Sequence, residues 1–148
     1  MIRMVVDLPN FHEIEANCTC GCGKRTDPNL MIRLQAFIFY LEAVYKGRVR
    51  CNITGPARCV KRQAEVYGVE GKESYHLGMS RKGKPGELGA ALDIICDYTD
   101  KHGSRVTIPK AELAKHAIAS KLFGGVIHKI YGDESRFLHV DLGPIREA

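Results

Sequence analysis

Two short apolar stretches, Ala90-Ala91-Leu92-Asp93-Ile94-Ile95-Cys96 and Phe137-Leu138-His139-Val140-Asp141-Leu142, decide the fold of this chain. Each is typical of a buried strand, and each carries acidic or histidine side chains on an apolar background. Side chains alternate between the faces of a strand, so His139 and Asp141 should share one face and their apolar neighbours the other. A carboxylate such as Asp93 is costly to bury unless it is paired or holds a metal. The two stretches therefore indicate a metal site on a sheet.

Three helices are predicted around these strands. A proline opens an apolar-periodic segment at 28–47 and another at 109–123, and glycine follows each segment. A shorter helix is expected over 57–67, after the turn at Gly55-Pro56. The Gly-rich residues 71–89 are expected to form a loop.

Further strands are expected at 48–53 and at 126–131, the second in a hairpin with 137–142. Helices and strands that do not alternate regularly indicate an α+β domain rather than a parallel βαβ sheet. We therefore predict a single domain over residues 1–148, with a small, mostly antiparallel sheet that carries the metal site and helices packed on it.

Composition excludes several classes of protein. The 148 residues are 45% hydrophobic and 26% charged, which is ordinary for a globular domain and not for a disordered chain. The formal net charge of +5 suits an anionic partner, although the aromatic interleaving and recognition helix of a nucleic-acid binder are missing. No apolar run reaches the ~20 residues of a membrane span, and an acid at position 7 interrupts any signal-peptide core. We expect synthesis in the cytoplasm and no membrane partner.

Three cysteines form an alternating run of Cys18, Cys20 and Cys22. With no secretion signal, a disulfide framework is disfavoured. The run could join a structural zinc site, completed by Cys59 or His12, or could consist of plain turn cysteines. Its one-residue spacing is not the C-x₂₋₄-C of common zinc modules, so both alternatives stay open.

Three motifs follow one another along the chain, Ser74-x-His76, Gly89-x-Ala91-x-Asp93 and His139-x-Asp141. Their order resembles that of the zinc D-alanyl-D-alanine carboxypeptidase family (the LAS-type metallopeptidases). That family includes D-Ala-D-Ala dipeptidases, phage endolysin peptidases and, by fold, the hedgehog signalling domain. Two upstream segments are similar as well: residues 52–59, which end in Arg-Cys, and residues 11–22 with the cysteine run.

The resemblance implies one zinc ion held by His76, Asp93 and His139, with Asp141 orienting an imidazole. It implies hydrolysis of peptidoglycan stem peptides at a D-amino acid, as a D,D-carboxypeptidase or an endolysin-type endopeptidase. The expected protein is a monomer that reaches the cell wall after phage-type release. The alternative is a zinc-stabilised binding module of the same fold that does not catalyse.

Catalytic roles follow from the same resemblance. A general base is expected shortly before the last histidine, where Glu134 is the first candidate and Asp133 the reserve. Arg58 is expected to bind a substrate carboxylate or to stabilise a developing oxyanion, because a guanidinium stays charged and offers two parallel donors.

One departure concerns the spacing of the ligands. In the family the aspartate follows the histidine by seven positions, whereas Asp93 follows His76 by 17, which inserts ten polar, Gly-rich residues within 77–88. The insertion could form a substrate-facing flap that leaves His76 in place. It could also displace His76, so that another histidine substitutes. A surface loop costs little closure entropy, which favours the flap.

Overall fold

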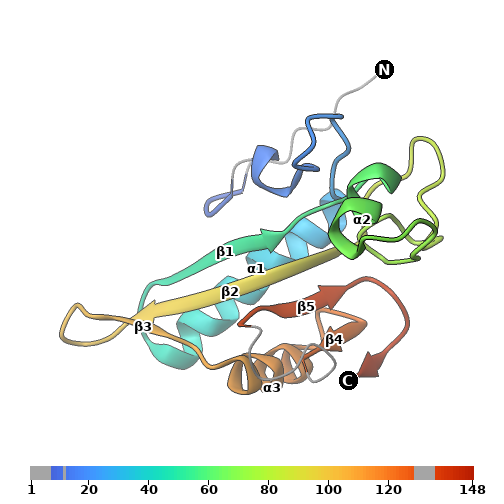
Figure 1. Ribbon diagram of the computed structural model, residues 1–148. Coiled ribbons are helices and arrows are strands. Elements are labelled where there is room, and N and C mark those ends of the chain that lie inside the picture. Colours follow the sequence, from blue (N-terminus) through green and yellow to red (C-terminus); the bar gives the residue numbers. More distant parts are fainter. Residues whose placement is uncertain (1–7, 12, 129–135) are drawn as a thin grey trace.

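Six strands form one sheet, and two helices pack against it (Figure 1). The computed structural model describes residues 8–11, 13–128 and 136–148. The elements in chain order are η1 (Glu13–Ala16), α1 (Pro28–Tyr45), β1 (Val49–Gly55), α2 (Val60–Tyr67), β2 (Ala91–Thr99), β3 (Arg105–Thr107), α3 (Lys110–Ser120), β4 (Gly125–Ile127), β5 (Leu138–Asp141) and β6 (Arg146–Glu147).

The strand order is β1-β2-β5-β4-β6, and β3 pairs with the far end of β2. All pairs are antiparallel except β4 with β6. This confirms the α+β class and the mostly antiparallel sheet. The strand pair β4 and β5 corresponds to the predicted hairpin; the residues that join them, 129–135, lie outside the described part of the chain.

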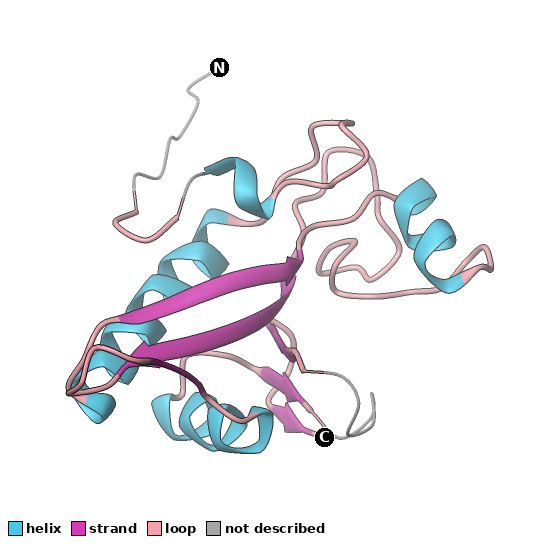
Figure 2. Cartoon of the chain, turned by 60° about the vertical axis from the view of Figure 1, so that its left-hand side comes forward, coloured by secondary structure: helices cyan, strands magenta, loops and turns pink. Residues whose placement is uncertain are grey.

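The core lies between the sheet and the helices α1 and α3, which both contact the sheet and each other (Figure 2). Leu92 and Ile94 of β2 point into it, as do Leu138 and Val140 of β5. The predicted alternation is therefore confirmed. The intervening polar residues of these strands fall on the opposite face of the sheet, away from the helices.

Local sequence explains where the helices begin and end. The side chain of Asp27 caps α1 by accepting from the Asn29 N–H at 2.9 Å, Pro28 occupies the first turn, and Lys46 ends the helix in the left-handed conformation. Helix α2 begins three residues later than predicted. Cys59 has an extended backbone and caps the helix through its sulfur, so residues 57–59 form a lead-in.

Three elements were not predicted: η1, β3 and β6. Each is at most four residues long, too short for a periodic apolar pattern. Strand β1 also extends two residues beyond the predicted end and includes Gly55, which the sequence suggests as a turn residue. Among the described residues, no helix is both long and apolar enough to cross a membrane.

Candidate metal centre

The candidate metal centre lies where β1, β2 and β5 meet, near the start of β2. Asp93 of β2 is paired directly with His139 of β5, so their side chains project from the same face of the sheet. On the other side, Gly55 of β1 is the register partner of Asp93. A Cβ on Gly55 would lie 2.2 Å from Asp93 Oδ2, so only glycine leaves room for this carboxylate.

His76 comes to the same place from the loop between α2 and β2. Its backbone N–H donates to Ser74 Oγ at 3.2 Å, and its carbonyl accepts from the Arg58 N–H at 3.0 Å. The neighbouring Tyr75 carbonyl accepts from the Ala90 N–H at 2.8 Å, which ties the loop to the residue before β2. The inserted residues therefore leave His76 beside Asp93 and His139. The substrate-facing role of the inserted residues stays a prediction.

The donor atoms of His76, Asp93 and His139 all lie within 4.8 Å of one another, and the three residues are only 2%, 5% and 5% exposed. Asp93 Oδ1 is 3.2 Å from His76 Nε2 and 3.1 Å from His139 Nδ1. A tetrahedral zinc ion with bonds of about 2.0–2.1 Å separates neighbouring ligand atoms by about 3.3–3.4 Å. The donor set therefore fits such an ion in both chemistry and spacing.

The outer nitrogens of both imidazoles are occupied by fixed acceptors. His76 Nδ1 is 3.0 Å from the carbonyl oxygen of Pro56, and His139 Nε2 is 2.7 Å from Asp141 Oδ2. Asp141 is fully buried and also accepts from both terminal nitrogens of Arg146, at 2.6 and 3.0 Å. Such partners fix the orientation and tautomer of a metal-binding histidine. Each imidazole thus turns its remaining nitrogen towards Asp93.

Burial and hydrogen bonding pull the pKa values of these groups in different directions. Burial lowers the pKa of His76, because the charged imidazolium loses its hydration. Burial opposes protonation of His139 too, but hydrogen bonds to Asp141 and Asp93 outweigh it and raise its pKa. For Asp93, burial alone would raise the pKa, yet the two histidines hold it well below its usual range. Burial would also raise the pKa of Asp141, but hydrogen bonds from His139 and Arg146 lower it to about 2. Near neutral pH Asp93 and Asp141 are therefore ionised and the imidazole of His76 is neutral.

Arg58 also faces the centre, from the lead-in to α2. Its Nη2 is 3.5 Å from Asp93 Oδ2, and its side chain is 12% exposed. Its Nη1 donates to Gln63 Oε1 at 3.1 Å, and Gln63 is buried in the first turns of α2. The guanidinium is therefore held beside the three donor residues.

A second group of possible ligands includes Cys59, the residue that follows Arg58 at the start of α2. The sulfurs of Cys18, Cys20, Cys22 and Cys59 all lie within 4.8 Å of one another. Of the two predicted completions of the cysteine run, Cys59 is the residue found there; His12 lies outside the described residues. These four residues and the His-Asp-His group could each hold a metal ion.

The comparisons with known proteins do not assign this chain to a family. No protein-family model, curated protein or solved structure matches this chain. The likeness to the zinc D-alanyl-D-alanine carboxypeptidase family therefore rests on the residues of the three short motifs alone.

Two predicted catalytic residues are not described by the structure, and three residues that contact the site were not predicted. Glu134 and Asp133, the candidates for a general base, lie outside the described residues. Gly55, Gln63 and Arg146 contact the site but were not predicted as site residues. The sequence suggested Gly55 only as a turn residue, although a glycine at a strand end is also a weak signal for a close backbone approach. Gln63 and Arg146 have no local signal, because their partners Arg58 and Asp141 lie outside the elements that carry them.

Proposed function

We propose that this chain is a zinc-dependent peptidase that hydrolyses peptidoglycan stem peptides at a D-amino acid. The observation that carries the proposal is the convergence of His76, Asp93 and His139, each from a different segment, with the outer nitrogens of both histidines already hydrogen-bonded. The substrate class is supported by the likeness of the three motifs to the zinc D-alanyl-D-alanine carboxypeptidase family.

The donor set suits a catalytic ion more than a closed structural one. Two imidazoles and one carboxylate leave a fourth tetrahedral position for water or substrate. The Pro56 carbonyl can only accept, so His76 carries its proton on Nδ1 and keeps the Nε2 lone pair for a metal. Asp141 likewise selects the His139 tautomer with a lone pair on Nδ1. Zinc, when bound, supplies Lewis-acid activation of water and of the scissile carbonyl.

The remaining roles fall to Arg58 and to an acid before β5. Arg58 can bind the substrate's terminal carboxylate, or the oxygen on which charge develops, through its pair of terminal nitrogens. We assign the general base to Glu134, with Asp133 as the reserve, on the likeness of the family alone. The base takes a proton from water and passes it to the leaving amine.

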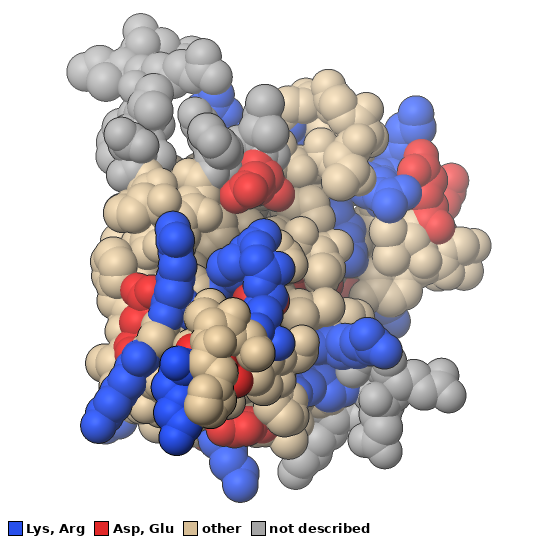
Figure 3. All heavy atoms as spheres, turned by 90° about the vertical axis from the view of Figure 1, so that its left-hand side faces the viewer, with Lys and Arg blue, Asp and Glu red and all other residues tan. Residues whose placement is uncertain are grey.

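The charge of the protein suits an anionic wall polymer in a general way. The formal net charge is +5, and on the face shown in Figure 3 Lys and Arg side chains are scattered among uncharged residues, with Asp and Glu between them. Such a distribution favours encounter with a polyanion without defining a specific site. The specificity of the proposed reaction must therefore come from the residues around the metal centre.

The first test combines metal content with product release. Protein purified without chelator is analysed for zinc and incubated with stem peptides ending in D-Ala-D-Ala, and with intact peptidoglycan, while released D-alanine and new amino groups are measured. Asp93→Asn should lose one zinc per chain together with the activity. Asp97→Asn, on the same strand but outside the His-Asp-His group and 3.8 Å from the exposed Arg105, is the matched control and should lose neither. Wild-type protein without zinc at this centre would overturn the proposal.

A second pair of variants separates an enzyme from a binding module. Glu134→Gln should abolish turnover while zinc content stays at the wild-type level, and Arg58→Ala should lower kcat/KM without removing zinc. A wild-type protein that binds zinc and stem peptide but releases no product would instead identify a non-catalytic module of the same fold. If Asp133 is the general base instead of Glu134, Asp133→Asn should lose turnover and Glu134→Gln should keep it.

A further inference from the structure

The four-cysteine group has the spacing of a complete metal site. Sγ of Cys18 lies 3.5 Å from that of Cys20 and 3.8 Å from that of Cys59, and Cys20 and Cys59 are 3.5 Å apart. Four sulfurs bound tetrahedrally to zinc at about 2.3 Å would be separated by about 3.8 Å. All six cysteines are free in this structure, so no disulfide explains the approach of the sulfurs.

Backbone N–H groups point at two of the four sulfurs. The Cys59 N–H donates to Cys18 Sγ at 3.4 Å, and the Arg62 N–H donates to Cys59 Sγ at the same distance. Cys59 is the N-cap of α2, so its sulfur lies where the helix presents N–H groups that have no partner within the helix. The backbone therefore holds these two sulfurs in place.

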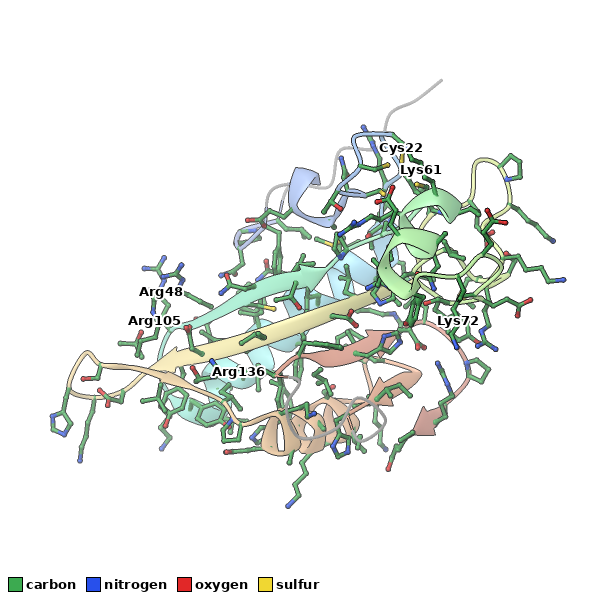
Figure 4. All side chains as sticks on the ribbon, viewed as in Figure 1. Cys22, Arg48, Lys61, Lys72, Arg105 and Arg136 are labelled. Carbon is green, nitrogen blue, oxygen red and sulfur yellow. The ribbon has the colours of Figure 1, made fainter. Side chains whose placement is uncertain are left out.

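The unusual cysteine spacing follows from the turn in which it occurs. Gly21 and Gly23 have φ angles of +82° and +84°, values that side-chain-bearing residues rarely adopt. The turn closes where the Cys18 N–H donates to the Lys24 carbonyl at 2.8 Å. Alternating glycines therefore let successive cysteines face one point, and Figure 4 shows Cys22 beside the first turn of α2, next to that point.

We propose that Cys18, Cys20, Cys22 and Cys59 form a closed, structural zinc site that joins the turn of residues 18–24 to the start of α2. Four thiolates leave no open position, so this ion does not take part in catalysis. This proposal does not depend on the proposed peptidase activity, because the four cysteines share no ligand with the His-Asp-His centre.

The site has one consequence that does rest on the proposed function. Cys59 directly follows Arg58, whose side chain reaches Asp93 and whose N–H donates to the carbonyl of His76. An ion bound by Cys59 would fix the backbone next to Arg58, while Gln63 holds the guanidinium of Arg58 by a hydrogen bond. Loss of the structural zinc should therefore loosen Arg58 before it disturbs the sheet.

The decisive experiment replaces zinc by Co²⁺ and measures both stoichiometry and absorption. Co²⁺ bound by thiolates gives an intense charge-transfer band in the near ultraviolet, which a centre of histidine and carboxylate ligands lacks. We expect this band in the reduced wild-type protein. The double variant Cys20→Ser/Cys22→Ser changes two exposed residues and leaves only two thiolates, so it should lose the band and one metal ion per chain. Cys51→Ser, a cysteine outside both groups, is the control and should keep them.

The outcomes separate this proposal from the peptidase proposal. Asp93→Asn should retain the thiolate band while it loses the other ion, so a failure at either centre can be recognised by itself. A wild-type protein without the thiolate band would overturn the zinc–cysteine site, whatever its activity. Mass spectrometry that finds disulfides among these four cysteines in protein prepared under reducing conditions would overturn it too.

Discussion

Replacement of Asp141 by asparagine should weaken metal binding at the His-Asp-His centre, although Asp141 is not itself a proposed ligand. The carboxylate is fully buried and accepts from His139 Nε2, the backbone N–H of Gly143 and both terminal nitrogens of Arg146. Asparagine keeps the shape but offers only one oxygen. In either orientation its NH₂ group must face a terminal nitrogen of Arg146, together with either His139 Nε2 or the Gly143 N–H, and all of these are donors.

The size of the effect can be worked out from these contacts. A hydrogen bond to a charged group contributes about 1.5–3 kcal/mol, and the His139 contact is of this kind. The Arg146 side chain is 35% exposed, so loss of that pair adds only about 1 kcal/mol after solvent screening. We expect unfolding of the metal-free protein to become easier by about 2–4 kcal/mol. Zinc affinity should fall by about 10–100-fold, as for other residues that orient a ligating histidine.

Competition with a chromophoric chelator measures the zinc affinity, and urea unfolding of the metal-free protein measures stability. Asp97→Asn again serves as the isosteric control; its partner Arg105 is half exposed at 3.8 Å, so loss of this pair should change stability by at most about 1 kcal/mol. A variant whose zinc affinity stays within about twofold of wild type would refute the idea that Asp141 orients His139, since such residues typically contribute tenfold or more.

Three further changes probe other parts of the molecule. Gly55→Ala should lower zinc binding sharply, because the added Cβ would lie 2.2 Å from Asp93 Oδ2; unchanged binding would contradict the observed packing. Glu87→Gln should destabilise the inserted loop at neutral pH: burial opposes ionisation of Glu87, but hydrogen bonds from Ser80 outweigh it and lower its pKa, so the stabilisation is complete above pH 4.5 and is lost as the pH falls through the lowered pKa of the folded protein. Limited proteolysis of this loop at pH 7 and at successive steps below pH 4.5 would show whether the difference between variant and wild type declines. Phe37→Ala should cost about 3–5 kcal/mol in urea unfolding, because a fully buried ring leaves a cavity; a loss under 1 kcal/mol would mean that this core collapses freely.

The candidate site could be predicted in part because its ligands interrupt strong local patterns. Asp93 and His139 are polar residues on apolar strands, and the period of two already assigns His139 and Asp141 to a common face. The register of β2 against β5 then places Asp93 beside His139. The place of His76 was uncertain from the sequence, because the inserted residues allowed either a loop excursion or a displaced ligand. Hydrogen bonds from Arg58 to the His76 carbonyl and from Ala90 to the Tyr75 carbonyl hold His76 at the site, and neither is visible in a local pattern.

The sequence by itself determined the α+β class, the two main helices and the polar face of strands β2 and β5, since each depends on neighbours within a few residues. Only the tertiary structure decided which distant groups complete each site. Cys59 joins the cysteine run across 41 residues, and Gly55 leaves the space that Asp93 occupies. Such contacts depend on strand register and loop closure, which are set by the packing of the whole chain and leave no periodic signal in any one segment.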